Sequence, residues 1–130
     1  MRRASHGDMT PEELRNRTKS FALDVIRFCG KVQADGTRDM TGQLMRAAAS
    51  VGANYRAVCR ARSDVEFIAK LGVAIEEADE SAYWLELLTE SGLAASTETS
   101  ALRNEAAELT RILVASRRTA KLNHQSRNRK

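Results

Sequence analysis

Aromatic residues and proline are scarce in this chain of 130 residues: aromatics make up 5% of it, and there is one proline. A β-sheet protein draws heavily on aromatic and β-branched residues. Alanine, leucine, glutamate and arginine, which dominate here, favour helices instead. The length suits one domain with a single core. Together these observations predict an all-α protein.

Long apolar runs are missing as well. No stretch approaches the roughly 18–20 consecutive apolar residues that span a bilayer. The first nine residues carry charge but lack the apolar core of a signal peptide. We therefore expect a cytoplasmic protein with no membrane partner.

The residue types that perform catalysis or bind metals are few. His6 and His124 lie in expected tails, so the Glu-x-x-His pairs of a di-iron bundle are missing. Cys29 and Cys59 have no histidine nearby, which argues against zinc, and a reducing compartment argues against a disulfide. The sequence contains neither a glycine-rich phosphate loop nor a nucleophile elbow. We expect no catalytic residues, metal, cofactor or small-molecule substrate, and hence no enzyme.

Four amphipathic segments make up the rest of the chain, each with apolar residues at helical spacing. Capping boxes at Thr10–Glu13 and Ser63–Glu66 mark two helix starts. The first helix leads into a turn at 34–37, and the others run from 37 or 38 to about 62, from 63 to 91, and from a polar turn at 96–100 to about 122.

Short turns between amphipathic helices predict an antiparallel up-down-up-down four-helix bundle, here over residues 10–122. Residues 1–9 and the basic residues 123–130 contain no apolar periodicity. We expect both of these terminal segments to be disordered tails.

A run of small residues occupies 47–53 in the second segment, with Gly52 in mid-helix. Glycine there costs about 1 kcal/mol relative to alanine. A helix tolerates that cost where another backbone approaches closely. Simple alanine-rich helix propensity is the other explanation for the run.

The third segment carries more apolar residues than one buried face needs. Its core stripe is Phe67, Leu71, Ala74, Ala78, Ser81, Leu85 and Leu88. Further apolar residues flank this stripe on both sides, and such surplus indicates either a partner surface or an unusually thick core. The candidates for an oligomer interface are Tyr83, Trp84, Leu87, Glu77 and Glu80.

Charge is distributed unevenly behind the net value of +4. Residues 64–90 contain eight acids and one base. The candidate phosphate contacts on the second and fourth helices are Arg46, Arg56, Arg60, Arg62, Arg117, Arg118 and Lys121. Ion pairs between second-helix arginines and Glu77, Glu80 or Glu86 are an alternative, and the basic tail is alternatively a solubilising end.

The middle of the chain resembles a known family. The pattern QLMRAA…SVGANY at 43–55, then Ser63, Glu66 and Phe67, then the Glu-rich stretch at 77–88, is similar to proteins encoded in intervening sequences of bacterial 23S ribosomal RNA genes. The resemblance implies a four-helix bundle that assembles into a ring, typically a pentamer. It implies no established activity. Related accessory proteins of diversity-generating retroelements bind nucleic acid.

Two functions are compatible with these features. The first is a homo-oligomeric, pentameric protein that binds structured RNA or DNA through its basic patches, in a salt-dependent and sequence-independent way. The second is a protein-interaction scaffold that does not bind nucleic acid.

Overall fold

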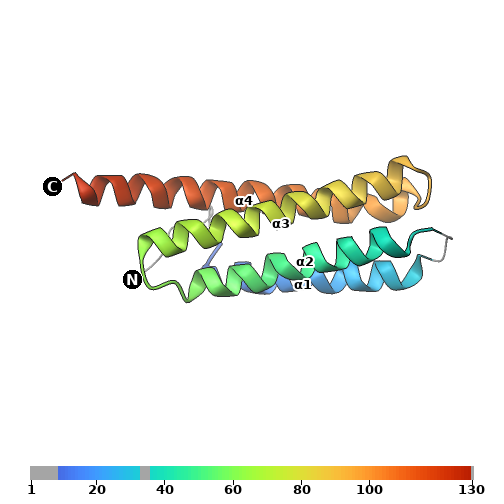
Figure 1. The fold of residues 1–130 in the computed structure, drawn as a ribbon, viewed down its shortest axis with the longest axis horizontal. Helices are drawn as coiled ribbons and strands as arrows, with labels where there is room; N and C mark the ends of the chain where they lie inside the picture. Colours follow the sequence, from blue (N-terminus) through green and yellow to red (C-terminus); the bar gives the residue numbers. More distant parts are fainter. Residues whose placement is uncertain (1–8, 33–35, 130) are drawn as a thin grey trace.

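The computed structural model describes residues 9–32 and 36–129, which form four helices: α1 (Pro11–Lys31), α2 (Arg38–Cys59), α3 (Asp64–Glu90) and α4 (Ser96–Asn128). Each helix packs against its neighbours in the chain, and α4 closes the bundle against α1 (Figure 1). The prediction of an all-α four-helix bundle is confirmed. Of the expected tail at 1–9, residues 1–8 lie outside the described residues, while Met9 packs against the core.

Helices α1 and α3 start at the two capping residues expected from the sequence. The Glu13 amide donates to Thr10 Oγ1 at 3.1 Å, and the Thr10 amide donates to the Glu13 carboxylate at 2.8 Å. At α3 the Glu66 amide donates to Ser63 Oγ at 3.1 Å, but the Glu66 carboxylate accepts from the Arg62 amide. Of the two hydrogen bonds expected for the second capping box, only the one from the Glu66 amide to Ser63 is therefore present.

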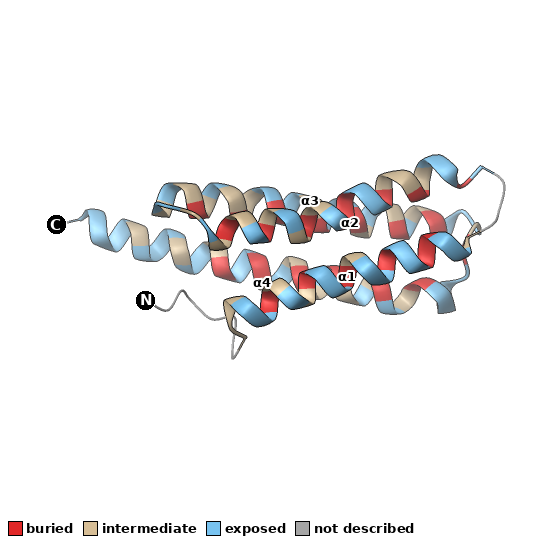
Figure 2. Cartoon of the chain, turned by 90° about the horizontal axis from the view of Figure 1, so that it is seen from below, coloured by how far each residue is buried: buried red, intermediate tan, exposed pale blue. Residues whose placement is uncertain are grey.

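The core contains the stripes that the sequence spacing defines (Figure 2). All seven residues of the expected α3 stripe are buried, and so are Leu44, Ala48, Val51, Tyr55 and Val58 of α2. Ala47 is buried too, which widens the apolar arc of α2. Period-3.6 patterning alone thus locates the core.

Gly52 faces the backbone of α1. A Cβ atom built on Gly52 would lie 3.6 Å from the carbonyl carbon and oxygen of Thr18, which is ordinary van der Waals contact. The two helices do approach closely here, as the small-residue run indicates. The space nevertheless accommodates a methyl group.

Helix α4 continues to Asn128, beyond the end expected near Leu122. Its last turns project past the turn between α2 and α3 (Figure 1), and none of their residues is buried (Figure 2). Residues 123–128 therefore differ from the expected disordered tail. In these turns Arg127 and His124 pair with Asp64 at the start of α3, across 63 and 60 residues of sequence.

Candidate nucleic-acid interface

The bundle is polarised in charge along its length. We call the half nearer the α2–α3 turn, residues 11–20, 49–74 and 112–129, the basic end; it contains twelve lysines and arginines and four acids. The remaining described residues contain six bases and eleven acids. The net charge of +4 hides this separation. Successive helices of the bundle run antiparallel. Bases from the start of α1, the end of α2, the start of α3 and the end of α4 therefore lie at the same end of the bundle.

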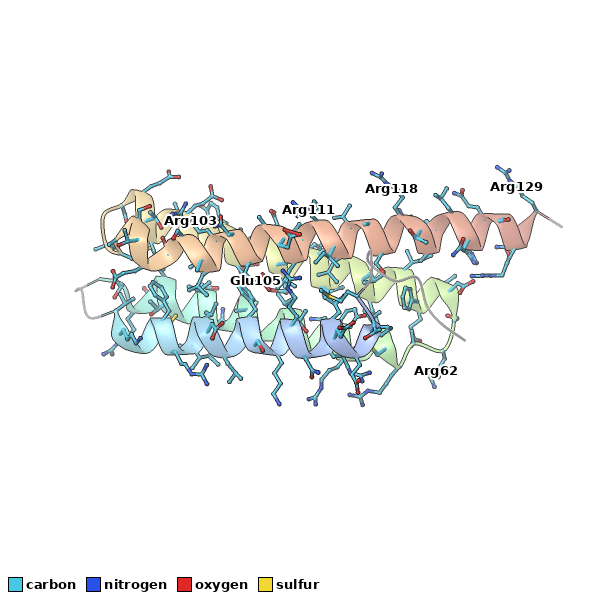
Figure 3. All side chains as sticks on the ribbon, turned by 180° about the vertical axis from the view of Figure 1, so that it is seen from behind. Arg62, Arg103, Glu105, Arg111, Arg118 and Arg129 are labelled. Atoms are coloured by element: carbon cyan, nitrogen blue, oxygen red, sulfur yellow. The ribbon has the colours of Figure 1, made fainter. Side chains whose placement is uncertain are left out.

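The last third of α4 supplies the largest share of the positive charge. No acid follows Glu108 in the described chain, whereas Arg117, Arg118, Lys121, Arg127 and Arg129 do. Arg118, Lys121 and Arg129 are exposed, and their side chains form no ion pair or hydrogen bond with any described residue. Figure 3 shows Arg118 and Arg129 pointing away from the bundle. These three side chains are available to an external anion.

Arg117 has a different role from its neighbours. Its guanidinium lies over Gly72 of α3, where an added Cβ would come within 3.4 Å of Nε, and Nε donates to the Ile68 carbonyl at 3.2 Å. Arg117 therefore fastens α4 to α3. Of the three α4 bases predicted to contact phosphate, only Arg118 and Lys121 have side chains without a hydrogen bond to a described residue.

A shallow groove between α3 and α4 runs beneath these bases. Its volume is about 390 Å³. Ile75, Val114 and Leu122 form its apolar part, and Arg117, Arg118 and Lys121 its basic part. Two of the exposed α4 bases, Arg118 and Lys121, thus lie along the edge of this groove.

Arg127 and His124 are held by the Asp64 carboxylate. Arg127 Nε donates to Asp64 Oδ2 at 3.1 Å, and His124 Nδ1 lies 3.3 Å from the same oxygen. Hydrogen bonds from Arg127, and next from His124, lower the pKa of Asp64. The carboxylate is therefore ionised at neutral pH and holds the α4 end in place.

The second-helix arginines do not form one patch with the α4 bases. Arg46 donates to Gln43 at 2.7 Å, and Arg62 lies 4.0 Å from Glu66. Arg56 and Arg60 are exposed without a partner among the described residues. None of the four pairs with Glu77, Glu80 or Glu86 within the described chain, so pairing with those acids would require a second copy.

Arg56 belongs to a second groove, on the opposite side of the bundle. This α1–α2 groove, of about 290 Å³, is lined by Arg15, Asn16, Lys19, Ala22, Ala49, Gly52, Ala53 and Arg56. Three bases border a floor of small residues, and no acid lines the groove. Arg15 and Lys19 were not among the bases predicted from the sequence. Their spacing of four residues, which places both on one side of α1, was the available signal.

Helix α3 presents the candidate interface residues in different environments. Tyr83 is 53% exposed and contacts the Trp84 ring edge-to-face, with centroids 5.3 Å apart. Trp84 and Leu87 are half-buried, and Trp84 Nε1 donates to Glu80 at 3.2 Å. Partial burial, together with the charges of Glu80 and Glu76, raises the pKa of Glu77.

The described residues contain no group of three or more potential metal ligands and no helix long and apolar enough to cross a membrane. Both cysteines are free; Cys29 is buried and Cys59 half-buried.

The family of the chain follows from comparison with known sequences. The family model for 23S rRNA-intervening sequence protein matches residues 12–115. The chain belongs to this family. No curated protein matches the chain.

A solved structure supports the assignment. It is the crystal structure of a protein with unknown function from the S23 ribosomal protein family of Bacteroides thetaiotaomicron VPI-5482. It is 26% identical to this chain, with a TM-score of 0.75, and the match covers 83% of this chain and 97% of that one. Neither comparison indicates an enzyme family.

The family match ends before the basic part of α4. It stops at residue 115, and every base of the α4 end follows that residue. Membership of the family therefore explains the bundle, whereas the charged extension must be interpreted from its own geometry.

Proposed function

We propose that this protein is a non-enzymatic, ring-forming homo-oligomer, pentameric as the family resemblance implies, that binds the phosphate backbone of structured RNA or DNA. The observation that carries the proposal is the row of exposed α4 bases, Arg118, Lys121 and Arg129, which no described acid neutralises. Arg60 and Arg62 add charge at the same end of the bundle. A ring would repeat this charge once per subunit.

The chemistry of the surface favours phosphate contact over base recognition. Guanidinium and ammonium groups pair with phosphate oxygens irrespective of sequence. The only exposed aromatic side chain among the described residues, Tyr83, lies on the acidic helix α3, so no stacking platform accompanies the bases. We therefore expect binding that falls steeply with salt and prefers duplex to single strands.

A gel-shift series with duplex RNA and duplex DNA across salt concentrations tests this function. Arg118→Glu/Lys121→Glu/Arg129→Glu should abolish binding. The corresponding alanine triple should reduce the slope of log K against log salt by about three, because each lost phosphate contact removes close to one unit. The matched control is Arg27→Glu/Lys31→Glu/Arg38→Glu, which changes net charge equally at the other end of the bundle. Equal loss in both glutamate variants would show that only total charge matters.

The alternative function, a protein-interaction scaffold, rests on the exposed apolar side chains of α3, among them Val65, Val73 and Tyr83. If the wild-type ring shows no salt-sensitive binding to either nucleic acid, the scaffold becomes the better interpretation.

A further inference from the structure

The outward side of α3 exposes large apolar side chains among its acidic ones. The exposed residues of α3 are Val65, Ala69, Val73, Glu76, Asp79, Glu80, Tyr83, Glu86 and Glu90. Six of them, Val65, Ala69, Val73, Glu76, Glu80 and Tyr83, make up what we call the outer face of α3. Val65 is 64% exposed, Val73 40% and Tyr83 53%. A one-sided amphipathic helix would place polar residues at these positions. The outer face of α3 thus combines exposed apolar side chains with the carboxylates of Glu76 and Glu80, which form no ion pair with any described residue.

The α1–α2 groove has the complementary character. Its floor consists of Ala22, Ala49, Gly52 and Ala53, and bases border it. Ile26 and Met45, 46% and 36% exposed, lie one helical turn beyond Ala22 and one before Ala49, so they extend the same apolar floor. Small side chains let another helix approach closely, while Arg15, Lys19 and Arg56 supply positive charge.

We propose that the outer face of α3 of one copy docks into the α1–α2 groove of the next, giving a head-to-tail interface. This rests on the assembly part of the proposed function. Charge complementarity selects the occupant. Among the described residues, Glu76 and Glu80 have no cationic partner, and Lys19 and Arg56 have no anionic one. A floor of alanine and glycine, by contrast, offers nothing to stack on a nucleobase.

The two surfaces also lie at the same level of the bundle. Residues 73–83 are the central turns of α3, and residues 15–26 and 45–56 are central in α1 and α2. A rotation about an axis parallel to the bundle therefore brings them together without a shift. Because different patches meet, the interface is heterologous. The outer face of α3 is not directly opposite the groove, since α3 packs against α2, so repeated docking curves towards a closed ring.

Arg56 has two alternative roles, contact with phosphate and ion pairing with acids of α3, and the proposed interface assigns it the second. In the assembly Arg56 pairs with acids of the neighbouring α3, while Arg118, Lys121 and Arg129 remain free for phosphate. Assembly and nucleic-acid binding are thus separable by mutation.

Light scattering after size exclusion tests the interface with two variants, each altered on only one of the two docking surfaces. Lys19→Glu/Arg56→Glu alters only the groove, and Val73→Asp/Tyr83→Asp alters only the outer face of α3; all four side chains are exposed. Each variant alone should fall from the ring mass to the 14.4 kDa monomer. The control Lys31→Glu/Arg38→Glu, at the far end of the same two helices, should keep the ring.

Mixing the two variants gives the sharpest outcome. One intact groove and one intact α3 face remain, so the mixture should form a one-to-one heterodimer that grows no further. A mixture that stays monomeric, or a groove variant that keeps the ring mass, overturns the interface. If Val73→Asp/Tyr83→Asp loses helical circular dichroism, Glu76→Lys/Glu80→Lys tests the same face and should also give a monomer.

The interface and the phosphate-binding function fail in distinguishable ways. A monomeric wild type removes the ring and this interface together, while the gel shift still reports on phosphate binding. A wild-type ring that survives both variants removes the interface alone. The α4 variant Arg118→Glu/Lys121→Glu/Arg129→Glu should keep the ring mass, because none of its residues belongs to either docking surface.

Discussion

Two glycines in mid-helix face different neighbours, and the difference sets their tolerance to a methyl group. The Cβ of alanine at position 52 would make ordinary contact with the Thr18 backbone. At position 72 it would lie 3.4 Å from two atoms of the Arg117 guanidinium. The contact at 3.6 Å is ordinary, and the contact at 3.4 Å lies at the tight limit of the ordinary van der Waals range.

We expect Gly52→Ala to stabilise the protein by up to about 1 kcal/mol, because alanine has the better helix propensity and restricts the unfolded chain. Gly72→Ala should gain less, since its methyl group would make a tighter contact with the Arg117 guanidinium, which is held by the Ile68 carbonyl. Urea denaturation of both variants measures the difference. A destabilised Gly52→Ala would mean that α1 and α2 approach more closely than the structure shows.

The Cys29 thiol should react slowly with thiol reagents in the native protein. Burial raises its pKa to about 11, and Sγ donates to the Thr41 carbonyl at 3.7 Å, so little thiolate is present at pH 8. In Cys59→Ser the remaining thiol should be labelled only as the bundle opens. Labelling in urea supplies the reference rate, and rapid native labelling would contradict the buried placement of Cys29.

At the scale of single elements, α4 shows how an apolar pattern underestimates the length of a helix. The helical spacing of its apolar residues predicted the buried part of α4, in which Leu102, Leu109 and Leu113 lie. The end after Leu122 has no apolar stripe, so it was expected to be a tail. Its fixing residue, Asp64, lies on another helix, and such long-range polar pairs cannot be derived from local sequence.

Asp64→Asn should free the last turns of α4. The pKa of Asp64 is lowered below its ordinary value of 3.8 by Arg127 and His124. Its contribution is therefore complete above pH 3.8 and is lost as pH falls through the lowered pKa. Amide exchange or backbone chemical shifts of residues 122–128 should show fraying in Asp64→Asn at pH 7, and in the wild type only in strong acid.

The matched control for that experiment is Asp39→Asn, in the first turn of α2, where the carboxylate is exposed. This variant should leave the α4 end unchanged. Unaltered protection of residues 122–128 in Asp64→Asn would show that α4 is helical there without the pair.

For the whole molecule, the contact between the first and last helices closes the bundle. Arg17 and Glu105 form a two-point pair across it, with Nε–Oε2 and Nη2–Oε1 distances of 2.7 and 2.8 Å (Glu105 is labelled in Figure 3). Both side chains are close to 30% exposed. Solvent therefore screens the pair, and its contribution stays modest.

Arg17→Ala should lower the free energy of unfolding by roughly 0.5–1 kcal/mol, the upper range for partly exposed pairs. Arg27→Ala, which removes only the exposed pair with Asp24 inside α1, should have no measurable effect. Chemical denaturation checks both. If Arg17→Ala and Glu105→Ala lose equal stability and the double variant loses no more than either, the pair itself is responsible.

The sequence predicted the architecture of the molecule better than its surfaces. Helix periodicity gave the core, including the complete α3 stripe, because each helix buries one continuous face. The candidate bases, however, were grouped by sequence position. Folding separates Arg56 from Arg118 by placing them on opposite sides of the bundle, and joins Arg56 to Arg15 and Lys19. Arg117, which spacing could not distinguish from Arg118, turns inward over Gly72.

The up-down order of the helices has a kinetic consequence. Three of the four helix–helix contacts join segments adjacent in the chain, so most of the structure forms with little loop-closure entropy, and a chain of such low contact order should refold within microseconds to milliseconds. Only the α1–α4 contact needs both ends of the chain, and it should form after the transition state. Removing the Arg17 side chain should then accelerate unfolding while leaving the refolding rate nearly unchanged.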